Sequence, residues 1–112
     1  MATIKRGDRK PDLEIIIGDD DAEADFTDVT VGMVRVLGEL DGVLVVDGTP
    51  SLVVPSQDGK ELTVTYPWGV GETDVAGRMW LSVEVEWAVD NTQTFPEEGA
   101  LLFGIERAPG DQ

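Results

Sequence analysis

Apolar and polar residues alternate along most of the chain, as in β-strands that have one buried and one solvated face. The longest alternating segment, 78–87, predicts an antiparallel strand of this kind. The side chains expected to face the core are Met79, Leu81, Val83, Val85 and Trp87. The side chains expected to face solvent are Trp80, Ser82, Glu84 and Glu86.

Shorter segments with the same period predict further strands. Val29, Val31 and Met33 are expected to begin a strand that runs to Leu37. Asp58-Gly59 is a strong hairpin signal between two such segments. The faces expected to be buried in the other clear segments carry Leu13, Ile15 and Ile17; Leu62, Val64 and Tyr66; and Leu101, Phe103 and Ile105. Short apolar runs at 43–46 and 52–54 complete about seven strands, which favours an antiparallel β-sandwich over an open sheet.

The length of 112 residues fits a single domain spanning 1–112. Residues 1–11 are expected to form a basic arm, since Lys5, Arg6, Arg9 and Lys10 are four of only eight basic residues. Residues 108–112 are expected to form a short flexible tail. The N-terminus has no apolar segment typical of a signal peptide, and no apolar run approaches the ~20 residues of a membrane span.

Charge and composition narrow the function. The formal net charge of −15 argues against binding to nucleic acid or to anionic membranes. The chain has no histidine, so Ser51, Ser56 and Ser82 have no partner for a Ser-His-Asp triad. A small hydrolase is therefore disfavoured, and we expect a protein that is not an enzyme and uses no cofactor.

An acidic run at 19–25 raises the question of a calcium loop. Ala24 stands at the glycine position of the EF-hand pattern and Thr30 stands at its twelfth position, so the pattern fails twice. With no cysteine available as a soft ligand, we expect a solvated loop and no metal site.

The aromatic residues suggest two different roles. Trp80 lies on the polar face of the best strand, where it is either a contact for a partner or covered by a loop of the same domain. Tyr66 and Trp68 flank Pro67 at the end of a strand and are expected to cap the core, with one polar atom each at the rim.

Three segments in this order resemble the N-terminal domain family of tailed-phage baseplate upper proteins. They are a short basic lead ending in Gly-Asp at 4–8, the turn YPWGVGETDVAG at 66–77, and Thr94-Phe95-Pro96 before the closing strand. Glu72 departs from the family, which usually has Asp there, and the region 37–54 is longer. The 112 residues do not include the stalk or receptor-binding region that often follows this domain in the family. As turn chemistry, Thr73 and Asp74 can bond local backbone amides, while Gly71 and Gly77 allow unusual backbone angles.

The resemblance implies an immunoglobulin-like sandwich that docks other proteins within a virion. We therefore expect a structural protein of the tail, baseplate or head-to-tail region, made in the host bacterial cytoplasm and present in several copies or as a symmetric homo-oligomer. A capsid decoration protein and a carbohydrate-binding module for the host surface are the alternatives. The expected docking residues are Lys5, Arg6, Arg9, Lys10 and Trp80. The expected structural turn residues are Tyr66, Trp68, Gly71, Thr73, Asp74, Gly77, Phe95 and Pro96.

Overall fold

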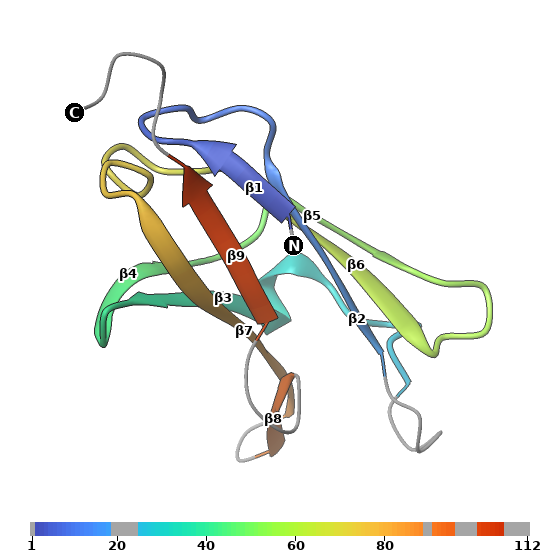
Figure 1. The fold of residues 1–112 in the computed structure, drawn as a ribbon. Helices are drawn as coiled ribbons and strands as arrows, with labels where there is room; N and C mark the ends of the chain where they lie inside the picture. The colour runs from blue at the N-terminus through green and yellow to red at the C-terminus, as the bar shows by residue number, and fades with distance from the viewer. Residues whose placement is uncertain (1, 19–24, 89–90, 96–100, 107–112) are drawn as a thin grey trace.

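The computed structural model describes residues 2–18, 25–88, 91–95 and 101–106 (Figure 1). Within these ranges the chain forms nine strands and one short 3₁₀ turn, with no helix long and apolar enough to cross a membrane. The strands are β1 (Ala2–Lys5), β2 (Leu13–Gly18), β3 (Val34–Leu40), β4 (Val43–Gly48), β5 (Leu52–Pro55), β6 (Glu61–Tyr66), β7 (Gly77–Ala88), β8 (Asn91–Phe95) and β9 (Leu101–Glu106), and the turn η1 is Val31–Met33.

The strands form two facing sheets, so the expected all-β sandwich is confirmed, with nine strands among the described residues where the pattern predicts about seven (Figure 1). The larger sheet has the order β1-β9-β7-β3-β4, and the smaller has the order β2-β6-β5. β9 pairs with the first half of β7 and β8 pairs with its second half, while β3 occupies the other side. Every pairing is antiparallel except that of β1 with β9, which is parallel.

The strand order is that of an immunoglobulin-like sandwich. In such sandwiches strands B, E and D are neighbours in one sheet and strands C, F and G are neighbours in the other. Here β2-β6-β5 and β3-β7-β9 take those places, and β4 adds a strand beside β3. The first strand differs, since β1 joins the larger sheet instead of lying beside β2.

The inner faces of the two sheets make the core. On β7, Met79, Leu81, Val83 and Val85 are buried and Trp87 packs against the core, as the alternating pattern predicts. A buried side chain of this size contributes roughly 1.5–3 kcal/mol to stability relative to an exposed one. Phe103 and Ile105 are buried as expected, but Leu101, the first residue of β9, is 37% exposed.

The strand expected from Val29 begins later. Residues Val31–Met33 form the 3₁₀ turn, in which the Met33 N–H donates to the Thr30 carbonyl at 3.0 Å. A turn of this kind breaks the period of two, so the buried residues of β3 are even-numbered, beginning with Val34 and Val36. Arg35, Leu37 and Glu39 consequently face outward.

The expected basic arm is wrong for residues 2–5, which form the edge strand β1 of the larger sheet. Ile4 is buried in the core, and the Arg6 N–H continues the pairing to the Glu106 carbonyl at 2.7 Å. The four residues of β1 are too few to show an alternating pattern, and charged residues follow Ile4 directly. The partner strand lies about a hundred residues away in the sequence, so it gives no local signal either. The expected C-terminal tail falls outside the described residues.

A candidate docking face around Trp80

Trp80 lies at the centre of the outer face of the larger sheet. The β7 pleat turns it away from the core, and 52% of its surface is exposed, so no described loop covers it as the alternative expectation required. In register across the sheet, Trp80 lies between Leu102 of β9 and Glu39 of β3, and Glu39 lies opposite Leu44 of β4. We call the outward residues of β3, β4, β7 and β9 around this row the Trp80 face.

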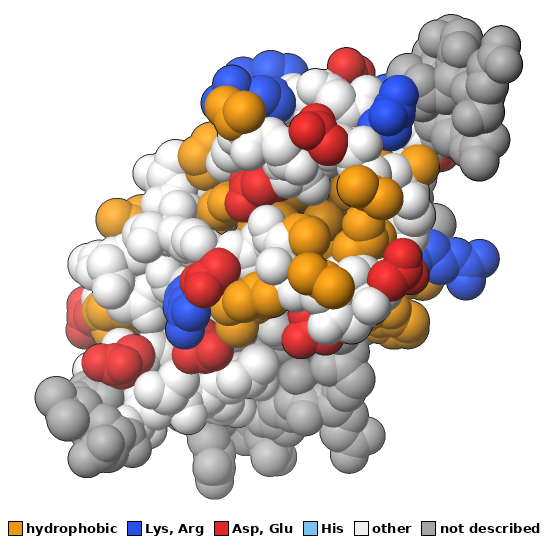
Figure 2. Space-filling view, turned by 90° about the vertical axis from the view of Figure 1, so that its left-hand side faces the viewer, with side chains coloured by type: hydrophobic (Ala, Val, Ile, Leu, Met, Phe, Trp, Pro, Cys, Tyr) orange, Lys and Arg blue, Asp and Glu red, His pale blue; other side chains and the backbone are white. Residues whose placement is uncertain are grey.

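The Trp80 face combines an apolar centre with polar surroundings. Figure 2 shows hydrophobic side chains gathered on one side of the molecule, with acidic and basic side chains around them. A shallow hollow of about 470 Å³ lies beside Trp80. It is lined by Arg35, Leu37, Glu39, Leu44, Trp80, Ser82 and Thr94. An aromatic anchor within a polar rim is the usual anatomy of a protein–protein contact.

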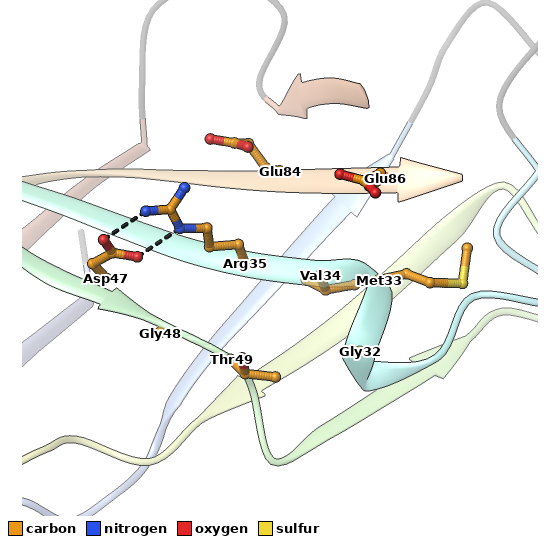
Figure 3. A pocket seen from close by; sticks show the side chains of 9 residues that line it. All are labelled: Gly32, Met33, Val34, Arg35, Asp47, Gly48, Thr49, Glu84 and Glu86. Atoms are coloured by element: carbon orange, nitrogen blue, oxygen red, sulfur yellow. Dashed lines mark hydrogen bonds and ion pairs between the residues drawn. The ribbon is translucent and has the colours of Figure 1, made fainter. Parts of the chain in front are cut away.

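An ion pair and two further carboxylates line a neighbouring hollow, which shares Arg35 with the hollow beside Trp80 (Figure 3). Arg35 donates to both carboxylate oxygens of Asp47, through Nε and Nη2, at 2.6 Å each. These bonds hold the pKa of Asp47 below its ordinary value, and the carboxylate raises the pKa of Arg35. Glu84 and Glu86 project from β7 on the same side, and the four charged groups line this second hollow of about 410 Å³.

The charge of this region is acidic. Asp47 neutralises Arg35, which leaves the carboxylates of Glu39, Glu84 and Glu86 around the hollows with no further cation among their lining residues. A surface with this balance complements a partner that carries lysine or arginine.

The expected basic docking residues do not gather at Trp80. Lys5 pairs with Glu106 at 2.6 Å on the outer face of the same sheet, but beyond the Trp80 row. Arg9 donates to the Trp68 carbonyl at 3.1 Å, and Lys10 pairs with Asp12 at 2.8 Å. Arg6 is exposed, and it too has an interaction partner.

The expected turn motif closes one end of the sandwich. Tyr66 is buried on β6, and its hydroxyl donates to Glu72 at 2.7 Å. The pKa of Tyr66 is raised mainly by burial and secondly by the hydrogen bond to this carboxylate. Glu72 also accepts the N–H of Gly69. Gly71 and Gly77 have φ angles of 87° and 152°, which explains the preference for glycine at both positions.

Thr73 connects this turn to the segment that follows β1. Its buried hydroxyl donates to the Asp8 carbonyl at 2.8 Å, and its own carbonyl accepts the Gly7 N–H at 2.9 Å. The expectation that Thr73 and Asp74 bond local amides is therefore wrong for the Thr73 hydroxyl, and Glu72 is the side chain that accepts a local amide. The first two segments of the resemblance thus lie in contact.

The other aromatic residues of the motif belong to the core. Trp68 is buried against Phe103, with ring centroids 5.4 Å apart, and its buried Nε1–H has no acceptor among the described residues, so the expected polar atom at the rim is wrong for this residue. Phe95 packs edge-on against Phe26 at 5.5 Å. Pro96 lies outside the described residues.

Sequence reasoning missed the residues that surround Trp80. The alternation of Arg35, Leu37 and Glu39 was available as a signal, but an assumed strand start at Val29 obscured it. Leu44 could have been placed through the two-residue turn at Asp41-Gly42, whose φ angles of 51° and 79° fit a tight hairpin.

The acidic run is described only at Asp25, whose carboxylate accepts the Thr27 hydroxyl and, at 2.9 Å, the Thr27 N–H; these two hydrogen bonds lower the pKa of Asp25. Residues 19–24 lie outside the described ranges. In the part of the chain that the structure describes, no three acidic side chains are grouped as they would be around a metal ion.

Comparison with protein-family models, curated proteins and solved structures finds no match to this chain.

Proposed function

We propose that this protein is a non-enzymatic docking domain of a tailed-phage virion, in the tail, baseplate or head-to-tail region, and that the Trp80 face binds a neighbouring virion protein. The observation that carries the proposal is a half-exposed tryptophan at the centre of a polar-rimmed apolar patch. A buried tryptophan anchor is among the commonest energetic centres of protein interfaces. The motif resemblance supports the virion context.

The strands support such a role because they hold the contact residues rigidly. Trp80, Glu39 and Leu44 come from three neighbouring strands whose inner faces are buried in one core. A preorganised surface loses less conformational entropy on binding than a mobile loop does. The acidic rim favours a basic partner and argues against a partner with an anionic surface.

Quantitative mass spectrometry of purified virions from the virus that encodes this chain tests the virion role. We expect the protein at a fixed copy number that matches the rotational symmetry of the tail or neck. A copy number that instead follows the number of capsid lattice sites would identify a decoration protein. Absence from the particles would refute the virion role.

One observation favours a carbohydrate-binding function as a second candidate. Ser82, Thr94 and Glu39 place hydrogen-bonding groups around the exposed Trp80 ring, as a sugar site requires. Titration with host surface polysaccharide, followed by tryptophan fluorescence, distinguishes the two functions. A saturating change that is lost in Trp80→Phe, with Trp87→Phe as control, would favour the carbohydrate function.

A further inference from the structure

Among the described residues, no strand lies along the outer edge of β2. In immunoglobulin-like sandwiches strand A lies beside strand B, but here β1 pairs with β9 and leaves β2 at the edge of the smaller sheet (Figure 1). An edge strand presents unpaired backbone N–H and C=O groups, to which another strand can add.

β2 is also the most regular edge among the described strands. It pairs with β6 over all six residues without a register shift, and it contains no proline. β5 has four residues and ends at Pro55, and β1 has four residues. The register of β4 shifts where Val45 forms a bulge, and the pairing of β8 with β7 also contains a register shift. Short edges, prolines and bulges are devices that prevent strand addition, and β2 has none of these three.

We propose that β2 pairs antiparallel with β2 of a second copy, so that the two smaller sheets form one continuous six-stranded sheet. The inference does not depend on the proposed function, because the Trp80 face belongs to the other sheet. A second copy fits because antiparallel pairing of identical strands is closed by a two-fold axis. It also continues both faces, with Leu13, Ile15 and Ile17 inward and Glu14 and Ile16 outward in each copy.

Charge and side-chain pairing select the register. With the axis at Ile16, the two Ile16 side chains, each 57% exposed in one copy, lie opposite one another on the outer face. Glu14, the only charged residue of β2, then lies opposite Gly18 of the partner copy and avoids the other Glu14. The contact contains no ion pair, so screening of the net charge of −15 by salt strengthens it.

A cysteine cross-link tests this pairing, because the natural chain has no cysteine. Directly opposite residues of antiparallel strands have Cα atoms about 4.5–5.5 Å apart, within the range that a disulfide spans. We expect oxidised Ile16→Cys to migrate as a covalent dimer. Val54→Cys, at a comparably exposed position on the same outer face but on β5, should stay monomeric. Cross-linking of Val54→Cys instead of, or as well as, Ile16→Cys would overturn the β2 register.

Sedimentation of the full chain provides the second readout. We expect a reversible dimer within a loading series up to ~1 mM, with tighter association at ~0.5 M than at ~0.05 M salt. Ile16→Lys places like charges opposite each other and should weaken the dimer about tenfold or more, while Val54→Lys should not. A monomer at every loading and salt concentration would overturn the proposal.

Discussion

The two outer faces of the sandwich both expose apolar side chains, but they are built differently. The Trp80 face has an aromatic centre, an Arg35–Asp47 ion pair and further carboxylates around shallow hollows. The outer face of the smaller sheet exposes Ile16, Leu52 and Val54 between threonines. The two surfaces therefore differ in what surrounds the exposed apolar side chains: hollows and charged groups surround Trp80, whereas threonines separate the aliphatic side chains of the smaller sheet.

Both faces depend on the shared core, and Val83→Asp should break them together. Val83 is fully buried on β7, so the substitution places an unpaired carboxylate between the sheets. We expect a loss of about 4 kcal/mol or more in the free energy of unfolding, measured by chemical denaturation. Ser82→Asp, one residue away on the outer face, should change it by less than about 0.5 kcal/mol. Equal stability of the two variants would mean that the faces of β7 are assigned wrongly.

The segment between β1 and β2 connects the two sheets, and Thr73 holds it through a hydrogen bond to the Asp8 carbonyl. Thr73→Val keeps the shape but leaves the Asp8 carbonyl without this donor, and should cost about 1–3 kcal/mol. Thr63→Val, on the outer face of β6, serves as the control and should be nearly neutral. A neutral Thr73→Val would remove the contact as a stabilising connection between the sheets.

How much of this architecture the sequence predicts depends on whether its signals are local. The period of two in β7 is local, and it correctly separates buried Val83 from exposed Trp80. Glycines at turns are also local, as Gly71 and Gly77 illustrate. Long-range pairing is not local, so the sequence predicts an arm where β1 forms. The 3₁₀ turn η1 likewise leaves no periodic signal, and β3 begins later than the pattern predicts. The Trp80 face was predicted only at its central residue, because its rim comes from strands whose register no local pattern fixes.

A pH titration tests the contact between Tyr66 and Glu72 in the adjoining turn, where we expect a smaller effect on stability. Tyr66 is the only tyrosine, and burial, together with the bond to Glu72, raises its pKa above the ordinary value of ~10. The folded state therefore holds this proton more tightly than the unfolded state does, so its contribution to stability is complete below pH ~10 and is lost as the pH rises beyond that value.

Ultraviolet absorbance of the phenolate should show a midpoint above ~10 for the folded protein and near ~10 in denaturant. Glu72→Gln should lower the folded midpoint without returning it to the ordinary value, since burial is the larger cause. A folded midpoint near ~10 would contradict the buried, bonded position of this side chain.

The central claim, that the Trp80 face docks a virion protein, is tested most directly by adding purified protein to particles assembled without it. Trp80→Ser and Val54→Ser both remove a half-exposed apolar side chain, one from each outer face, and each should lower the free energy of unfolding by about 1–2 kcal/mol and leave the protein folded. The amount of protein bound per particle is then measured at ~0.15 M salt. We expect Val54→Ser to bind like the parent chain and Trp80→Ser to lose most of its binding, since truncation of an interface anchor costs about 2 kcal/mol or more. Equal binding by both variants would contradict the account.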